Sequence, residues 1–233
     1  MVTRTLGPVF GAVALGAVWC GPGLAPHWPA LAHAMDVPLR LGDGGGVALT
    51  FDDGPHPEGT PAVLDILAQR GAKATFFVVA EQVARYPSLV AEMVASGHQT
   101  AVHGYRHRSQ MRLLPGEFAA DLQRAVEVIG EASGRPPRLY RPPYGIFTVV
   151  GLAEVRRVAL DPLLWSKWGR DWRRSTSPDE IVRLVARGLA ESDVVLLHDA
   201  DWYSSPGSHR HTAAALPGIL DVLDERGLRT VVA

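Results

Sequence analysis

The sequence predicts an α/β protein of one domain, in which about seven parallel strands form either a doubly wound sheet or a barrel-like closure. The 233 residues fit a single domain with a full hydrophobic core. From Val47 onward, short apolar runs alternate seven times with segments of helical periodicity, a pattern typical of parallel strands joined by crossover helices. Glycines that directly follow helical segments support the helix ends, namely Gly71, Gly97, Gly134 and Gly227.

The predicted strands are short runs rich in apolar and β-branched residues. They cover residues 47–51, 74–79, 99–103, 139–141, 163–165, 194–198 and 229–232. The predicted helices carry apolar residues at helical spacing and cover residues 60–70, 88–96, 115–133, 147–158, 178–190 and 212–226. The glycines at 44–46 precede the first strand, whereas a dinucleotide-binding loop follows it, so a Rossmann-type cofactor site is not expected.

The composition excludes several classes of function. A formal net charge of -1 with 20% charged residues gives no electrostatic reason to bind nucleic acid, and none is expected as a partner. The single cysteine, Cys20, excludes an internal disulfide framework and a cysteine-rich zinc site. Any metal would therefore be bound by histidine and carboxylate.

The N-terminal segment differs from the rest of the chain. Arg4 precedes an almost entirely apolar stretch over residues 6–20, and small residues stand near a possible cut after Ala32 or Ala34. This order is typical of a secretory signal and predicts export, as a secreted or membrane-anchored protein. The apolar stretch is shorter than the ~20 residues that a full membrane span needs. The alternatives to a signal are therefore a short uncleaved membrane anchor or a buried helix, and a buried helix would mean a cytoplasmic protein. The expected division of the chain is a signal-like or anchoring segment 1–34, a linker 35–46 and a catalytic domain 47–233.

Polar side chains collect just past the C-terminal ends of the predicted strands. They are Asp52 and Asp53, His103 and His107, Arg141, Asp171, and His198 with Asp199. At that edge of a parallel α/β fold the loops converge on one crevice, so these strand ends predict a single functional site. Taken singly, each residue has an ordinary structural explanation, such as a helix cap or a solvated loop charge.

Three of these residues together form a candidate metal site. Asp53, His103 and His107 supply one carboxylate and two imidazoles, a ligand set that leaves positions open for water and substrate. A metal so bound lowers the pKa of its water and polarises a carbonyl, as hydrolysis of an amide or ester requires. The reaction also needs a base and an acid, for which Asp52 and His198 are the candidates.

Five motifs occur in order along the chain. They are Thr-Phe-Asp-Asp-Gly-Pro at 50–55, His-Gly-Tyr-Arg-His at 103–107, Arg-Pro-Pro-Tyr at 141–144, Asp-Trp at 171–172 and Leu-Leu-His-Asp at 196–199. In this order they resemble the motifs of the polysaccharide deacetylases, carbohydrate esterase family 4. The resemblance implies a distorted (β/α) barrel and metal-dependent removal of N-acetyl groups from a polysaccharide containing N-acetylglucosamine, either peptidoglycan or a chitin-like glycan. It also implies a divalent metal, Zn²⁺ first, with Co²⁺ or Mn²⁺ as alternatives.

Carried over residue by residue, the resemblance assigns the chemistry of the site. It implies that Asp52 is the general base and that Arg141 pairs with it. It also implies that the metal ligands are Asp53, His103 and His107. A nearby arginine keeps a base carboxylate ionised, which is consistent with the first assignment.

The resemblance likewise assigns the acid and the substrate contacts. His198 is the expected general acid, and Asp171 orients it and stabilises its protonated ring. Tyr144 is expected to offer its backbone N–H to the oxyanion, Trp172 to wall the groove, and Leu196 to line the pocket for the acetyl methyl group.

Some positions depart from the family pattern. The family usually has serine or threonine, whose hydroxyl braces the metal-bearing loop, where Gly104 stands. Trp168 occupies a position that often carries an aspartate, so an aromatic surface replaces a polar contact. The aromatic segment 201–211 either covers the site or is an ordinary surface loop, and His56 has no assigned role.

Two other functions use the same residues. One is hydrolysis of a small amide or cyclic imide in the cytoplasm, against which export and an open aromatic groove argue. The other is a glycan-binding module without catalysis, against which Asp52 and His198 argue, because binding needs neither base nor acid. We therefore expect a cell-wall hydrolase that is a monomer, with membrane association limited to its N-terminal segment.

Overall fold

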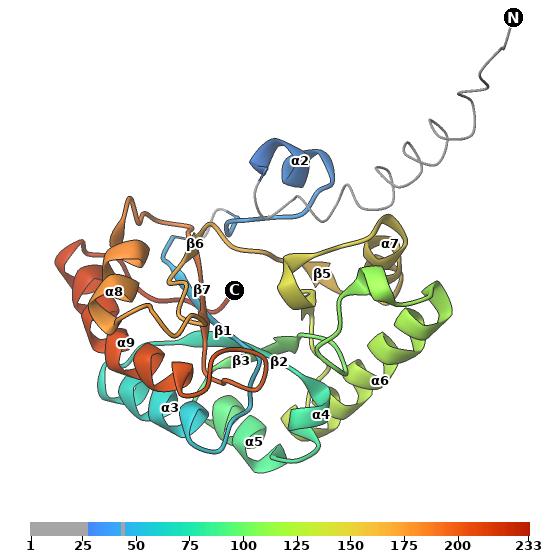
Figure 1. Ribbon diagram of the computed structural model, residues 1–233, viewed down its shortest axis with the longest axis horizontal. Coiled ribbons are helices and arrows are strands. Elements are labelled where there is room, and N and C mark those ends of the chain that lie inside the picture. The colour runs from blue at the N-terminus through green and yellow to red at the C-terminus, as the bar shows by residue number, and fades with distance from the viewer. Residues whose placement is uncertain (1–27, 43–44) are drawn as a thin grey trace, which may run out of the picture.

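In the computed structural model, which describes residues 28–42 and 45–233, a seven-stranded parallel sheet runs through the molecule (Figure 1). The strands are β1 (Ala48–Asp52), β2 (Ala74–Val78), β3 (Gln99–Val102), β4 (Leu139–Tyr140), β5 (Asp161–Pro162), β6 (Lys167–Trp168) and β7 (Val194–His198). Their order in the sheet is β5-β4-β3-β2-β1-β7-β6. Every neighbouring pair is parallel, as the alternation of strands and helices predicts.

The sheet curls because its two edge strands are consecutive in the chain. Strands β5 and β6 lie at opposite edges, yet residues 163–166 alone connect them. Five residue steps reach at most about 18 Å, whereas seven flat strands would be about 29 Å wide. The two edges must therefore approach each other, and the expected distorted barrel is confirmed. We call residues 163–166 the barrel seam.

Helices cover the outer face of the curled sheet, except for α2, which lies over its open side (Figure 1). They are α2 (Pro29–Ala34), α3 (Gly59–Gln69), α4 (Ala80–Val83), α5 (Pro87–Ala95), α6 (Pro115–Ser133), α7 (Val149–Arg157), α8 (Pro178–Ala186) and α9 (Ser208–Glu225), with single 3₁₀ turns at Gln110–Arg112 and Pro143–Gly145. Helix α6 shows how local sequence sets these bounds. The Glu117 carboxylate accepts the Leu114 N–H at 2.9 Å, and Gly134 ends the helix with φ 70°.

The core consists of the strands and the apolar faces of the helices. All five residues of β1 and of β2 are buried, as expected for central parallel strands covered on both faces. Phe51 and Phe76 stack across these two strands with ring centroids 5.2 Å apart. The central strands are thus rigid supports for the residues at their C-terminal ends.

Two predicted strands are wrong. Residues 163–165 are apolar and buried, but they cross the open side of the sheet, and the edge strands β5 and β6 flank them on either side. Within the described residues, 229–232 contribute one isolated bridge, Val47 to Thr230, and no strand. The helix predicted over 212–226 begins earlier in the structure, since α9 begins at Ser208. Helix α4 was not predicted.

Residues 28–42 pack across the open side of the barrel (Figure 1). Ala32 and Val37 are buried, the Leu164 N–H donates to the Pro38 carbonyl at 2.9 Å, and the Leu41 N–H donates to Ser192 at 2.8 Å. The stretch expected to act as a linker is therefore held against the domain as far as residue 42. Most of the signal-like segment, residues 1–27, lies outside the described residues, and the predicted division of the chain stays a prediction. No helix of the described part of the chain is long and apolar enough to cross a membrane.

Candidate active site

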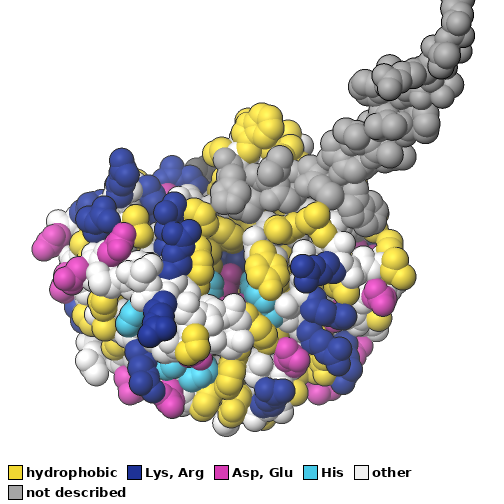
Figure 2. Space-filling model, viewed as in Figure 1, with side chains coloured by type: hydrophobic (Ala, Val, Ile, Leu, Met, Phe, Trp, Pro, Cys, Tyr) yellow, Lys and Arg dark blue, Asp and Glu magenta, His cyan; other side chains and the backbone are white. Residues whose placement is uncertain are grey.

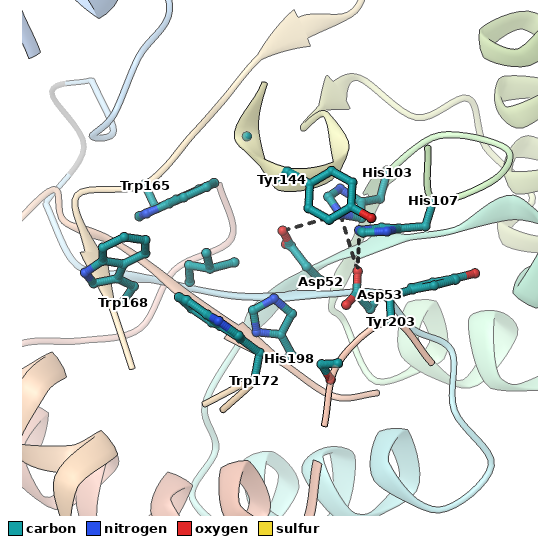
Figure 3. Close-up of a pocket in the computed structure, with 13 residues that line it drawn as sticks. Asp52, Asp53, His103, His107, Tyr144, Trp165, Trp168, Trp172, His198 and Tyr203 are labelled. Carbon is teal, nitrogen blue, oxygen red and sulfur yellow. Dashed lines mark ion pairs between the residues drawn. The ribbon is translucent and has the colours of Figure 1, made fainter. Parts of the chain in front are cut away.

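A pocket of about 320 Å³ opens at the C-terminal ends of the strands. Figure 2 shows a hollow in the middle of this face, where histidine and acidic side chains lie between hydrophobic ones. Eight of the ten predicted site residues line it, namely Asp52, Asp53, His103, His107, Tyr144, Trp172, Leu196 and His198 (Figure 3). The other two, Arg141 and Asp171, are fully buried directly behind them. The structure thus brings the predicted set together.

The turn after β1 lets two adjacent carboxylates reach the same pocket. Side chains of successive strand residues normally point to opposite faces. Asp52 ends β1, and Asp53 adopts a left-handed conformation with φ 78°, which redirects its side chain. Gly54 follows because a Cβ there would lie 2.5 Å from a carboxylate oxygen of Asp199. Asp199 is buried behind the turn, where it accepts a hydrogen bond from the Thr60 hydroxyl and does not line the pocket.

Asp53, His103 and His107 form the candidate metal centre. Asp53 Oδ1 lies 3.4 Å from His103 Nε2 and 3.3 Å from His107 Nε2. The ligand atoms of the three residues all lie within 4.8 Å of one another. Asp53 Oδ1 is buried and has no hydrogen-bond partner among the residues that the structure describes. A buried carboxylate oxygen facing two ring nitrogens fits a divalent cation of the zinc type.

The protonation of these groups also suits metal binding. Burial alone would raise the pKa of Asp53, but the neighbouring imidazoles of His103, His198 and His107 lower it to about 2. Burial lowers the pKa of His107 to about 4. Both groups are deprotonated at neutral pH, as ligands must be.

Asp52 is held by a buried arginine. Arg141 Nη1 lies 2.6 Å from Asp52 Oδ1 and donates to the Thr50 hydroxyl at 2.8 Å. The same guanidinium donates to the Leu163 and Leu164 carbonyls of the barrel seam, at 3.1 and 2.8 Å. The carboxylate therefore has a fixed position and a compensated charge. Thr50 lies in the first motif, but the motif predicts no role for it.

His198 faces the pocket with a carboxylate behind it. Asp171 Oδ1 lies 3.0 Å from His198 Nδ1, while Asp171 Oδ2 accepts the His198 backbone N–H at 2.6 Å and the Thr212 hydroxyl at 2.8 Å. Burial alone would lower the pKa of His198, but the charge and hydrogen bond of Asp171, with the charges of Asp53 and Asp52, raise it to about 10. The ring is therefore protonated at neutral pH. No local sequence signal points to Thr212, which lies on α9.

Aromatic side chains form the opposite side of the pocket (Figure 3). The ring centroids of Trp165 and Trp168 are 6.1 Å apart, and those of Trp168 and Trp172 are 5.5 Å apart. The Trp172 ring also meets His198 edge-on at 5.6 Å, and Leu196 lies in the lining with 4% of its surface exposed. Trp165 was not predicted as a site residue, because it was placed within a buried strand.

The loop between β7 and α9, residues 199–207, reaches over the candidate metal ligands. Tyr203 lines the pocket and stacks on His107 with ring centroids 4.3 Å apart and an interplanar angle of 9°. The first part of the predicted segment 201–211 therefore covers the site, and the remainder forms the start of α9. Tyr144 meets His107 edge-on at 4.7 Å and has a left-handed backbone with φ 62°.

A parallel barrel whose carboxyl edge gathers a carboxylate, two imidazoles, and a separately paired acid and base has the architecture of a barrel hydrolase. Comparison with known proteins narrows this class. Residues 42–162 match the family model Polysaccharide deacetylase. The chain belongs to the polysaccharide deacetylase family, and the resemblance of the five motifs is confirmed.

Relatives cover most of the chain. A chitooligosaccharide deacetylase of Bradyrhizobium sp. (strain ANU 289) is 39% identical over 191 residues, which cover 78% of this chain and 85% of that protein. A peptidoglycan-N-acetylglucosamine deacetylase of Bacillus cereus is 33% identical over 201 residues, which cover 86% and 70%. The solved structure of a family 4 carbohydrate esterase from Streptomyces lividans in complex with acetate aligns with a TM-score of 0.72 at 34% identity, over 80% of this chain and 92% of that one.

Proposed function

We propose that the protein is a metal-dependent hydrolase that removes N-acetyl groups from a polysaccharide containing N-acetylglucosamine, either peptidoglycan or a chitin-like glycan. One observation carries the proposal. Asp52 and His198 line the same pocket as the candidate metal ligands, and they have opposite partners, an arginine and an aspartate. Such a pair of separately tuned groups is what general base and general acid catalysis requires.

The proposed metal ligands are Asp53, His103 and His107. Their two imidazoles and one carboxylate favour Zn²⁺, and Co²⁺ or Mn²⁺ also accept this donor set. A divalent cation bound there supplies Lewis-acid polarisation of the acetyl carbonyl and lowers the pKa of the attacking water. We propose that the Tyr144 backbone N–H faces the developing oxyanion, where a fixed donor stabilises negative charge.

Asp52 is the proposed general base. Its Oδ1 is occupied by Arg141 at 2.6 Å, and its Oδ2 lies 3.8 Å from His103 Nε2, beside the metal ligands. The free oxygen is therefore placed to accept the proton of a water that attacks the acetyl carbon. Arg141 keeps the carboxylate in place while that proton is transferred.

His198 is the proposed general acid. Asp171 occupies its Nδ1 at 3.0 Å, so Nε2 is the nitrogen available to the pocket. An amide releases its amine readily only when the nitrogen is protonated, and a ring with a pKa raised to about 10 holds the required proton at neutral pH. Thr212 and the His198 backbone N–H together fix the orientation of Asp171.

The aromatic side of the pocket is the proposed sugar-binding surface. Trp172 and Trp168 offer ring faces of the size of a pyranose, and Leu196 offers an apolar contact for the acetyl methyl group. The relatives named above are deacetylases of chitooligosaccharide and of peptidoglycan, which supports a glycan over a small amide or imide.

We propose an extracytoplasmic location, because the substrate is a cell-wall or extracellular glycan and residues 1–34 resemble an export signal. A cytoplasmic location is the alternative for a small-amide hydrolase. N-terminal sequencing of the protein isolated from its cell of origin tests this proposal, since a cut after Ala32 or Ala34 gives a new N-terminus at His33 or Met35.

The deciding experiment measures acetate release from N-acetylglucosamine oligomers, peptidoglycan fragments and small amides in parallel. We expect activity on the glycans that a chelator abolishes and Zn²⁺ restores. Acetate release that is unchanged by chelation would rule out the metal mechanism. Activity confined to small amides would favour the imide or amide hydrolase, and no activity with metal bound would favour a binding module.

A further inference from the structure

The two candidate imidazole ligands are supported in different ways. His103 Nδ1 lies 2.8 Å from the Arg141 carbonyl, which fixes the ring and its tautomer. His107 Nδ1 is buried and has no hydrogen-bond partner within residues 28–42 and 45–233. Metal-binding histidines usually donate this second N–H to a fixed acceptor, so something else must orient the His107 ring.

The loop that carries the two histidines offers no such acceptor. Gly104 follows His103 and has a left-handed backbone with φ 93°, in which other residues are strained. A Cβ at this position would lie 3.0 Å from the Arg106 carbonyl oxygen. A side chain that braces the loop from position 104 is therefore disfavoured.

Tyr203 is placed to orient His107 instead. The two rings are almost parallel, with centroids 4.3 Å apart, and Figure 3 shows His107 between the rings of Tyr144 and Tyr203. The Tyr203 hydroxyl donates to Glu81 Oε1 at 2.8 Å and accepts a hydrogen bond from Gln82 Nε2 at 3.0 Å, both on α4. The phenol is thus held at its far end while its face packs on the ligand.

The β7–α9 loop that carries Tyr203 is itself anchored. Asp201 Oδ1 lies 3.3 Å from His56 Nε2, and Asp201 Oδ2 lies 3.2 Å from His209 Nδ1 and accepts the Gly207 N–H at 2.6 Å. The indole N–H of Trp202 donates to the Pro55 carbonyl at 3.1 Å. These contacts tie Asp201 and Trp202, the two residues before Tyr203, to the turn after β1 and to the start of α9.

The cluster of His56, Asp201 and His209 has the composition of a second metal site, but its hydrogen bonds argue against one. His56 Nδ1 accepts the backbone N–H groups of Glu58 and Gly59, at 3.2 and 3.0 Å. The neutral ring therefore carries its proton on Nε2, the atom that faces Asp201. A metal at Nε2 would leave the His56 ring without a proton, so the cluster is better explained as an anchor in which both rings lie against the Asp201 carboxylate. Both ring nitrogens of His209 are buried and have no hydrogen-bond partner among the described residues.

We propose that Tyr203 is a positioning residue for the metal ligand His107, and that the cluster of His56, Asp201 and His209 anchors the β7–α9 loop in the position this requires. The proposal rests on the proposed function, in which His107 binds the metal. It assigns His56, which has no role in the five motifs, to the support of the metal site.

The test compares metal affinity in variants of the full chain. Zn²⁺ affinity is measured by competition with a chromogenic chelator, and Co²⁺-loaded protein reports ligand geometry through its visible spectrum. We expect Tyr203→Leu to weaken Zn²⁺ binding about tenfold, the range typical of lost outer support, and to alter the Co²⁺ spectrum. Tyr203→Phe keeps the ring and loses its hydroxyl contacts, so it should retain most of the affinity.

Two further variants test the pocket lining and the loop anchor separately. Trp168→Leu removes an aromatic ring from the opposite side of the same pocket, and its Zn²⁺ affinity should equal that of the wild type. Asp201→Asn should weaken Zn²⁺ binding in the same direction as Tyr203→Leu but less, because it loosens the loop without removing the ring.

The outcomes separate the two proposals. Wild-type affinity and an unchanged Co²⁺ spectrum in Tyr203→Leu would overturn the positioning role. If Tyr203→Leu also lowers the thermal unfolding midpoint, the Zn²⁺ affinity of Tyr203→Phe separates lost stacking from lost stability. A loss of Zn²⁺ affinity in Tyr203→Phe equal to that in Tyr203→Leu would exclude ring stacking as the cause. A wild-type chain that binds neither metal would instead refute the proposed function.

Discussion

The two sides of the pocket are built by different means. On the proposed proton-transfer side, defined by Asp52, Asp53 and His198, two of the groups lie against a fully buried charged partner, Asp52 against Arg141 and His198 against Asp171. Asp53 lies 3.4 Å from the His103 ring. On the aromatic side, defined by Trp165, Trp168 and Trp172, the rings are arranged chiefly by stacking on one another. Proton transfer requires positions fixed within a fraction of an ångström, whereas a sugar face tolerates small shifts. Substitutions on the first side should therefore change turnover, and those on the second side substrate affinity.

The largest effect is expected for Asp52→Asn. Losing the base should lower kcat on N-acetylglucosamine oligomers by about a thousandfold, while the metal content stays near normal. Asp53→Asn is the matched variant and should lose the metal as well. Acetate release and metal analysis measure both quantities. Equal metal contents in the two variants would contradict the division of roles between the adjacent carboxylates.

Arg141→Met should be the most destabilising substitution on the proton-transfer side. It leaves the Asp52 charge buried without its partner and frees two carbonyls of the barrel seam, so the free energy of unfolding should fall by about 3–5 kcal/mol. Denaturant unfolding measures this change. The double variant Asp52→Asn/Arg141→Met removes the orphaned charge and should regain part of the loss; no recovery would mean that the ion pair is not the cause.

Asp171→Asn should shift the pH dependence of the free energy of unfolding and of kcat. The pKa of His198 is raised from 6.5 to about 10 in the folded chain, so its contribution to stability is complete below pH 6.5 and is lost as the pH rises toward 10. Without the Asp171 charge, this decline in the free energy of unfolding should become shallower, and the alkaline limb of kcat should move to lower pH. Thr212→Val keeps the carboxylate and should give a smaller shift in the same direction. An unmoved alkaline limb in Asp171→Asn would exclude His198 as the acid.

The smallest effect is expected on the aromatic side. Trp168→Asp restores the residue type common in the family and removes one ring face from the pocket. We expect KM for N-acetylglucosamine oligomers to rise about fivefold, equivalent to about 1 kcal/mol, with kcat changed by less than about twofold. Initial rates over a range of oligomer concentrations separate the two constants. A large loss of kcat with normal KM would show that this side also positions the reacting group.

The sequence predicted the parts of the molecule that depend on local patterns. The acids after β1 and the histidines after β3 follow apolar runs, and their meeting follows from the rule that parallel strands end at one edge. Thr212, on α9, was missed, and the segment 201–211 that contains Tyr203 was left with two interpretations, because long-range packing decides where the β7–α9 loop and α9 lie. The predicted strand 163–165 failed because burial of an apolar run does not reveal whether it pairs with a neighbour.

The barrel seam has a consequence for the order in which the molecule unfolds. It joins the edge strands β5 and β6 directly in the chain, and the Leu163 and Leu164 carbonyls accept hydrogen bonds from the Arg141 side chain, which also pairs with Asp52. When the edges separate, the Arg141 guanidinium loses two of its four partners, and Asp52, the proposed base, loses its fixed position. We expect activity to decline at denaturant concentrations that leave the central strands intact, with amide exchange at 163–166 faster than in β1 and β2. The line along which the barrel first opens thus passes through the proposed catalytic base.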